Sequence, residues 1–245
     1  MSTQPGVKND RRDWSPTERL EVLRRCPLFA AWPEARLAEV AAMARAIFHP
    51  RGAEIFASDP GRRELFVIAT GGIEVSRGSA EGKKFVHSVN GPPEVLAMVR
   101  LLARPPIHYV YRAYTDSVLL HLSAERLIAI LDADPILWRD VALLMCARQS
   151  DSLRLLSGRQ LGSLEQQMAA TLAELARIHG VAGGRGIELG LRLPQEQLGA
   201  MLGITRQSVN KLLRGFEAEG LIAVDYNRIT IVDPARLDDM ALQRD

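Results

Sequence analysis

Cysteine is scarce in this chain of 245 residues, which contains only Cys26 and Cys146. The two lie far apart in the sequence and form no Cys-x-x-Cys or Cys/His spacing. The pattern therefore indicates neither a zinc site nor the four thiolates of an iron–sulfur cluster, and we predict no metal site. Two cysteines also make no disulfide framework, so we expect reduced thiols in a cytoplasmic protein.

Long apolar runs and a strong charge of either sign are lacking as well. No run approaches the roughly 20 apolar residues of a membrane span, and the N-terminus lacks a signal-peptide pattern, so we expect no membrane partner. The formal net charge of +2 is small, so only local charge could attract a polyanion. No Ser/His/Asp constellation, metal-ligand spacing or phosphate-binding loop favours an enzyme.

The segment from Leu193 to Asp233 predicts a helix, a tight turn, a second helix and a hairpin. Gly203 follows the first apolar helix and suits the left-handed conformation that ends a helix. Thr205 can cap the second helix. That helix has apolar positions on one side and polar side chains that can reach phosphates and bases on the other. The candidate DNA-binding residues are Thr205, Arg206, Gln207, Ser208, Asn210, Lys211 and Arg214.

A wing is predicted directly after these helices. Leu221–Val224 and Ile229–Val232 alternate like strands about a polar turn. A winged helix-turn-helix reads duplex DNA by placing its second helix in the major groove. Two alternatives stay open: a polar face that is only solvated, and an interaction module whose winged helix binds protein.

The N-terminal half predicts an antiparallel β-roll or barrel, because short apolar strands follow one another with Gly turns between them. The expected strands are Glu54–Ala57, Leu65–Thr70, Ile73–Arg77, Phe85–Val89, Tyr109–Ala113 and Val118–Leu122. Helices are expected at Thr17–Arg25 and Glu34–Ala46 before the strands, and a short helical segment at Val95–Ala103 within them.

A long helix is expected from Pro135 to about Ser157, followed by a hinge at Ser157–Ser163. Its apolar strip is broad at the start and narrows later, which favours pairing with a second copy; a core helix packed on the roll is the alternative. The dimer-helix candidates are Trp138, Val141, Ala142, Met145, Ser152 and Leu156. A second helix at Leu164–His179 and a Gly-rich loop at Gly180–Gly186 precede the DNA-binding segment.

The predicted fold class is therefore α+β, with an N-terminal antiparallel β-roll, a long dimerisation helix and a C-terminal winged helix-turn-helix. We expect a disordered lead over 1–14 and a roll domain over 15–134. The dimerisation helix and hinge would cover 135–162, and the DNA-binding domain 163–245.

From about Leu28 onward the chain resembles the cyclic-AMP receptor protein and fumarate–nitrate regulator (CRP/FNR) superfamily of bacterial transcription regulators. The resemblance is strongest in LPQEQLGAMLGITRQSVNKLLRGFEAEGLI and in the wing YNRITIVD. It extends to the roll order, the Gly71–Gly72 turn and the long helix. It implies a homodimer that binds palindromic double-stranded DNA, contacts RNA polymerase and responds to a small-molecule effector held in the roll.

The resemblance places the base contacts on Arg206, Gln207 and Lys211. The family's common pattern there is Arg-Glu with a later Arg. Arg206 matches and can grip guanine with its planar fork. Gln207 in place of Glu favours adenine over cytosine, and Lys211 keeps the charge without the bidentate geometry. The half-site sequence is therefore expected to differ from the family's common one.

The roll departs further from the family pattern for cyclic nucleotides, in which Gly-Glu binds the ribose and a later Arg-Ser or Arg-Thr binds the phosphate. Ala97 and Met98 stand at the first pair, and Ile107 and His108 at the second. The sequence therefore predicts no cyclic AMP binding. No cofactor is predicted.

The effector-pocket candidates are Met98, Leu101, His108, Tyr109, Tyr111 and Ser152. Tyr109 and Tyr111 are expected on one face of a strand because alternate residues point the same way. These side chains either line an apolar pocket for a non-nucleotide ligand or fill the cavity and leave the protein effector-free. A haem sensor using one of the five histidines and a Cys26–Cys146 redox switch are further alternatives.

Overall fold

The computed structural model describes residues 13–56, 63–78, 84–102, 109–190, 193–225 and 228–242, with the backbone alone at 154–161 and 242. The expected disordered lead lies almost wholly outside these residues. The chain divides into two compact units, of which the first takes residues 1–77 and 89–148 and the second takes residues 78–88 and 149–245. The main boundary lies in helix α5 (Trp138–Leu161). Among the helices that the structure describes, none combines the length and apolar composition needed to cross a bilayer.

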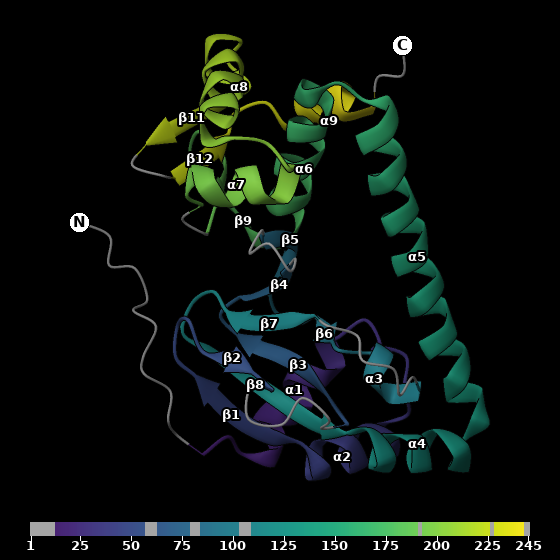
Figure 1. Ribbon diagram of the computed structural model, residues 1–245. Helices are drawn as coiled ribbons and strands as arrows, with labels where there is room; N and C mark the ends of the chain where they lie inside the picture. The colour runs from purple at the N-terminus through teal and green to yellow at the C-terminus, as the bar shows by residue number, and fades with distance from the viewer. Residues whose placement is uncertain are drawn as a thin grey trace. The chain divides into compact units, whose positions relative to one another are not determined.

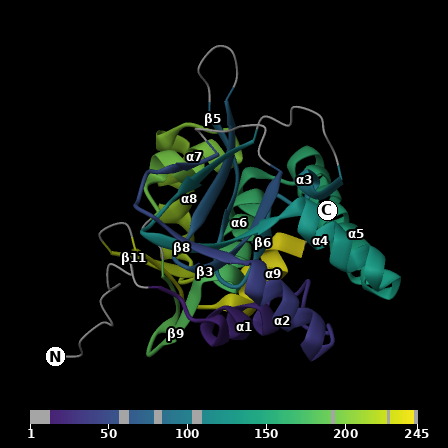
Figure 2. The same cartoon turned by 90° about the horizontal axis from the view of Figure 1, so that it is seen from below.

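Two four-stranded sheets form the roll, which belongs to the first unit except for Gly78 and residues 84–88 (Figures 1 and 2). One sheet has the order β1 (Arg45–His49), β8 (Ser117–Ser123), β3 (Glu64–Thr70), β6 (Val95–Leu96). The other has the order β2 (Glu54–Ile55), β7 (Val110–Ala113), β4 (Ile73–Gly78), β5 (Lys84–Asn90). Strand β8 is antiparallel to both β1 and β3, and β7 to both β2 and β4. The predicted antiparallel β-roll is thus confirmed.

The core of this unit lies where the central strands meet the helices. Phe66, Ile68 and Leu119 on β3 and β8 are fully buried. Helices α1 (Pro16–Arg25), α2 (Glu34–Met43) and α4 (Ala124–Ala133) pack against these strands and against one another (Figure 1). Because both faces of the strands are covered, their sequences are nearly continuous apolar runs.

Close packing explains one of the Gly turns. Gly71 connects β3 to β4 with φ of +84°, and a Cβ there would lie 2.3 Å from the Ser117 Oγ. The Gly72 amide donates to the Ser117 Oγ at 3.1 Å, and the Ser117 hydroxyl donates to the Thr115 carbonyl oxygen at 2.7 Å. Only glycine fits both the left-handed backbone and the short approach to β8.

Two expected helices of the first unit have different bounds. The helix expected at Glu34–Ala46 ends at Met43, because Arg45 already pairs with His121 in the β1–β8 ladder. The segment expected as helical from Val95 begins as strand β6, which pairs with β3, and only Val99–Leu102 forms helix α3. Residues 103–108, with Ile107 and His108, lie outside the described residues.

The second unit has a sheet of order β11 (Ile222–Asp225), β12 (Arg228–Ile231), β10 (Gly186–Leu189), β9 (Gly180–Gly183). Its helices are α6 (Leu164–His179), α7 (Gln195–Leu202), α8 (Arg206–Ala218) and α9 (Pro234–Leu242). Helix α6 begins with a capping box between Ser163 and Gln166, and α9 packs on it.

The Gly-rich segment of this unit was expected as a loop and forms a hairpin instead. Strand β9 pairs with β10 from Gly180↔Leu189 to Gly183↔Gly186. A Cβ on Gly180 would lie 2.1 Å from the Ala176 carbonyl oxygen of α6. The glycine therefore allows the chain to turn directly from helix into strand, which propensity alone does not predict.

Helix α5 is longer than expected. The chain forms a 3₁₀ turn at Pro135–Leu137 and then one helix to Leu161, so Gly158 lies within the helix. The expected hinge at Ser157–Ser163 is wrong for its first residues, and the break between α5 and α6 is confined to Gly162–Ser163.

Candidate nucleic-acid interface and effector region

The turn between α7 and α8 is built on two glycines. Gly203 has φ of 71° and ψ of 26°, and ends α7 in the left-handed conformation that the sequence predicted. The Ile204 amide donates to the Gly199 carbonyl oxygen at 3.0 Å, and a Cβ on Gly199 would lie 2.7 Å from the Ile204 carbonyl oxygen. Gly199 thus lets the chain fold back onto α7 and fixes the angle between the helices.

The two helices are held together by apolar side chains. Leu198 and Leu202 of α7 are buried, as are Val209, Leu213 and Phe216 of α8. Thr205 caps α8, since its Oγ1 accepts the Ser208 amide at 3.2 Å. The polar side of α8, which carries Arg206, Gln207, Asn210, Lys211 and Arg214 and is called the reading face below, is therefore presented by a closely packed pair of helices.

The predicted DNA-binding residues all lie at the start or on the polar side of α8. Thr205, Arg206, Gln207, Lys211 and Arg214 are exposed, whereas Ser208 and Asn210 are half-buried. The hydroxyls of Thr205 and Ser208 lie 3.0 Å apart in the cap, so both already have a local structural role. Exposed cationic and amide groups on one helical face suit phosphate and base-edge contacts.

Sequence reasoning missed two residues of α7 that contact this face. The Glu196 Oε1 lies 3.2 Å from the Arg206 Nη1. The Asn210 Nδ2 donates to the Gln195 Oε1 at 3.3 Å. The sequence shows only that Gln195 and Glu196 begin α7, directly after Pro194. It does not show which residues of α8 they contact, because that depends on how the two helices cross.

The wing is formed by β11 and β12, which pair from Ile222↔Ile231 to Asp225↔Arg228. The Glu217 Oε1 of α8 accepts the Val224 amide at 2.9 Å and ties the wing to the helix. Arg228, also missed, pairs with Glu188 of β10 at 2.9 Å. The turn residues Tyr226 and Asn227 lie outside the described residues.

Gly199 offers a direct test of this interhelical geometry. Gly199→Ala places its Cβ against the Ile204 carbonyl oxygen, and we expect it to destabilise the α7–α8 pair by about 1–3 kcal/mol. Gly215→Ala in α8 makes the same chemical change where nothing lies within 4 Å of the new Cβ. It should stabilise α8 by up to about 1 kcal/mol. Hydrogen exchange of the α7 and α8 amides measures both; equal effects of the two variants would contradict the close approach.

The effector-pocket candidates differ in burial, and one of them, Ser152, belongs to the second unit. Met98, Leu101 and Tyr111 are buried, at 5%, 1% and 5% exposure. Tyr109 precedes β7 and is 37% exposed, so it differs in burial from Tyr111, and their shared face stays a prediction. His108 lies outside the described residues, and Ser152 is half-buried on α5.

Aromatic rings surround Tyr111 inside the roll. Its ring meets those of Phe66 and Phe56 edge-on, with centroids 5.5 and 5.9 Å away. The Arg100 guanidinium lies 4.2 Å from the centroid of Phe56. Arg148 donates to the Val95 carbonyl oxygen, and burial lowers the pKa of its guanidinium. The interior of the first unit around Tyr111 therefore contains packed aromatic rings and a cation–π contact between Arg100 and Phe56.

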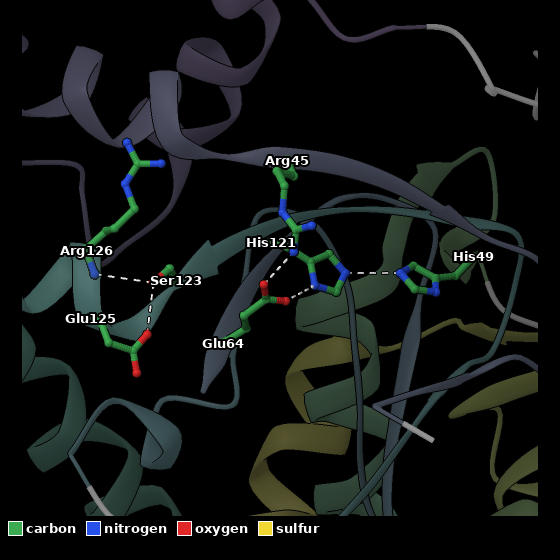
Figure 3. Close-up of polar contacts among 7 residues, drawn as sticks. All are labelled: Arg45, His49, Glu64, His121, Ser123, Glu125 and Arg126. Carbon is green, nitrogen blue, oxygen red and sulfur yellow. Dashed lines mark hydrogen bonds and ion pairs between the residues drawn. The ribbon is translucent and has the colours of Figure 1, made fainter. Parts of the chain in front are cut away.

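A cluster of four polar side chains, Arg45, His49, Glu64 and His121, links strands β1, β3 and β8 of the same unit (Figure 3). The His121 Nδ1 on β8 donates to the Glu64 Oε2 on β3 at 3.0 Å, and Arg45 on β1 pairs with the same carboxylate. The His49 and His121 Nε2 atoms lie 3.1 Å apart. The ring centroids are 5.3 Å apart, so the nitrogens point almost directly at each other, as in an imidazole–imidazole hydrogen bond. Figure 3 also shows Ser123 capping α4 through the Arg126 amide.

Burial dominates the titration of this cluster. It lowers the pKa of His121 to about 4, against the raising effect of Glu64, and it lowers the pKa of His49. Among the described residues, no group of three or more His, Cys, Asp or Glu side chains is placed to hold a metal ion. Cys26 is buried, which raises its pKa to about 12, whereas Cys146 is exposed, and both thiols are free.

The His121 cluster makes stability depend on pH. The unfolded chain binds a proton at His121 near pH 6.5, whereas the folded chain does so only near pH 4. The free energy of unfolding should therefore fall as the pH drops from about 6.5 to 4, by up to about 1.4 kcal/mol per pH unit for one proton. Urea unfolding between pH 4 and 8 measures this. His121→Gln should flatten the slope by about one proton; an unchanged slope in His121→Gln would contradict the assignment.

Two candidate dimer residues on α5 do not face outward. Val141 is buried in the core of the roll unit, and Trp138 is half-buried with its indole N–H donating to the Asp132 Oδ1 at 3.1 Å. Ala142 and Met145 are exposed. The Leu156 side chain lies outside the described residues. The sequence also missed exposed apolar residues on this helix, namely Leu143, Cys146 and Leu153.

Comparison with known proteins gives two family matches. The Crp-like helix-turn-helix domain matches residues 166–240, and the cyclic nucleotide-binding domain matches residues 47–134. The chain is 30% identical over 182 residues to the HTH-type transcriptional regulator Cmr of Mycobacterium tuberculosis, covering 74% of this chain and 70% of that protein. It is 22% identical over 218 residues to the CRP-like cAMP-activated global transcriptional regulator of that species, covering 89% and 97%.

Solved structures agree in fold. FixK2 from Bradyrhizobium japonicum superposes with a TM-score of 0.71 at 18% identity, covering 82% of this chain and 99% of that one. A CRP/FNR family regulator from Thermus thermophilus gives 0.68 at 21% identity, covering 82% and 100%. Together with the relative at 30% identity, these matches show that the chain belongs to the CRP/FNR superfamily of transcription regulators and carries its cyclic nucleotide-binding-like domain and its helix-turn-helix DNA-binding domain.

Proposed function

We propose that the chain acts as a homodimer that binds a palindromic operator, with one α8 helix in the major groove of each half-site. The observation that carries this proposal is the rigid, cap-stabilised α8, whose exposed face presents Arg206, Gln207, Lys211 and Arg214. Arg206 and Gln207 suit guanine and adenine edges, Lys211 can also reach a base edge, and Arg214 adds a phosphate contact. The domain limits 15–134, 135–162 and 163–245 are part of this proposal.

Selection of duplexes from a random library with the full-length protein tests it. The proposal predicts enrichment of an inverted repeat whose half-site centres lie one helical turn, or a multiple of it, apart. If no duplex is enriched, the result favours the alternative in which the winged helix binds protein instead of DNA. Adding RNA polymerase to the operator complex is expected to give a ternary complex, because regulators of this fold act at promoters.

The roll is proposed to be either effector-free or specific for a non-nucleotide ligand. The relatives' names mention differing signals, cyclic AMP for one and c-di-GMP for a regulator from Xanthomonas campestris. The fold therefore does not fix the effector. Buried aromatic rings around Tyr111 support an interior filled by side chains or lined for an apolar ligand. Native mass spectrometry of purified protein separates these cases and would detect haem.

Cyclic AMP is expected not to bind. Ala97 and the buried Met98 stand where the ribose-binding Gly-Glu is expected, and Ile107 where the phosphate-binding Arg is expected. Burying an unpaired phosphate charge costs several kcal/mol, whereas micromolar affinity corresponds to only about 8 kcal/mol in total.

Titration calorimetry with cyclic AMP and cyclic GMP should give no isotherm below millimolar concentrations, and operator binding should not change with either nucleotide. Arg112 pairs with Glu54 at 3.2 Å and Arg100 lies over Phe56, so neither replaces the missing Arg in this arrangement. A clear micromolar isotherm would mean that the nucleotide-binding residues lie at other positions than those assigned, or that Arg100, Arg112 or Arg104, which lies outside the described residues, binds the phosphate.

A further inference from the structure

Glu196 contacts the residue that carries base recognition in the proposed function. It lies in the first turn of α7, and its Oε1 is 3.2 Å from the Nη1 of Arg206, the first residue of α8. The two side chains are 64% and 68% exposed. An ion pair this exposed contributes about 0–1 kcal/mol to folding, so stability alone gives it little role.

The backbone beneath this pair is tightly fixed. The Gly199–Ile204 hydrogen bond and the packing of α7 against α8 set the distance between the start of α7 and the start of α8. A second contact runs in parallel, from Gln195 to Asn210. Gln195 and Glu196 are neighbours on α7, while Arg206 and Asn210 are one turn apart on α8 and share a face. The first turn of α7 thus contacts two side chains of the reading face.

Electrostatics gives the Glu196 carboxylate a specific task. The N-terminus of a helix carries partial positive charge and repels a cation placed there. Arg206 occupies that position in α8, and α8 has no acidic residue in its own first turn. Glu196 supplies the missing negative charge from the neighbouring helix, on the Nη1 side of the guanidinium, and leaves the rest of the planar fork available to an acceptor.

We propose that Glu196 is a positioning residue that sets the sequence specificity of DNA binding by holding the Arg206 guanidinium for bidentate contact with a guanine. The inference rests on the proposed function, in which Arg206 reads a base. The same carboxylate repels phosphates, so Glu196 weakens attraction to DNA of any sequence while it sharpens the choice among sequences.

Glu196→Gln in the full-length protein separates these two effects. We expect affinity for random-sequence duplexes to rise about two-fold per subunit, because one repulsive charge is removed. The ratio of operator affinity to random-duplex affinity should fall about five-fold or more, as Arg206 loses its fixed orientation. The loss should fall on one base pair of each half-site, the same pair whose preference Arg206→Ala abolishes. In the Arg206→Ala background, Glu196→Gln should leave the ratio unchanged.

Glu174→Gln is the matched control, because it removes the same charge from an ion pair, that of Glu174 with Arg177, which lies within α6 and not at α7 or α8. It should leave the base preference intact. If Glu196→Gln tightens binding to operator and random duplexes equally, Glu196 only repels DNA and the proposal is wrong. If Arg206→Ala leaves base preference unchanged, the assignment of Arg206 to a base fails first, and this inference fails with it.

Discussion

Arg206→Ala is expected to weaken operator binding by about 1–3 kcal/mol for each half-site, because a bidentate arginine–guanine contact is lost. Arg206 begins α8, is two-thirds exposed, and contacts only the Glu196 side chain among the ion pairs described. The loss should be concentrated at one base pair of each half-site. Fluorescence anisotropy with the selected operator and with its single-base variants measures both the size and the position of the effect.

Arg177→Ala controls for charge, because it removes one exposed cation from α6 of the same unit. It should weaken operator and random duplexes alike, and only slightly. If Arg206→Ala weakens binding to both kinds of duplex equally, Arg206 contacts phosphate and reads no base.

Met145→Glu is expected to convert the dimer to monomers and to abolish tight operator binding. At 100° per residue, the exposed Ala142, Met145, Cys146 and Leu153 fall within an arc of about 100° on α5. If this arc meets its copy across a two-fold axis, two glutamates would face each other in an apolar seam, where burying like charges costs several kcal/mol.

Light scattering of the purified variant measures its mass directly. Ala147→Glu is the control, because Ala147 is exposed on the opposite side of α5 from Met145 and should leave the dimer intact. A dimeric Met145→Glu protein would place the seam elsewhere. If both Met145→Glu and Ala147→Glu give monomers, added charge on either side of α5 breaks the dimer, and the seam is not assigned to the Met145 side.

The DNA-binding unit was the most predictable part of the chain because its signals are local. Gly203 has the left-handed backbone expected of it, and Thr205 caps α8 as expected. Both effects act within four residues of the chain. The hairpin of β9 and β10 was missed because its four glycine positions have low strand propensity, and backbone pairing between the two strands outweighs that preference.

The sequence predicted the antiparallel strands of the roll, but not strand β6 or the side-chain contacts inside the roll. Strand β6 exists because Val95 and Leu96 pair with β3, nearly thirty residues earlier in the chain, and no local pattern carries that information. Tyr109 and Tyr111 differ in burial because β7 starts only at Val110. The His49–His121 contact joins residues more than seventy positions apart. The ion pair of Glu196 likewise depends on how two helices cross.

Methylation interference at guanine N7 shows whether Arg206 reads a guanine, because α8 is proposed to enter the major groove, where N7 is exposed. We expect two guanine positions, symmetric about the operator centre and about one helical turn or a multiple of it apart, at which methylation blocks the wild-type protein. Arg206→Ala, at concentrations high enough to bind, should lose sensitivity at those two positions and keep it elsewhere. Binding that is insensitive to major-groove methylation, or interference that is unchanged in Arg206→Ala, would contradict the account.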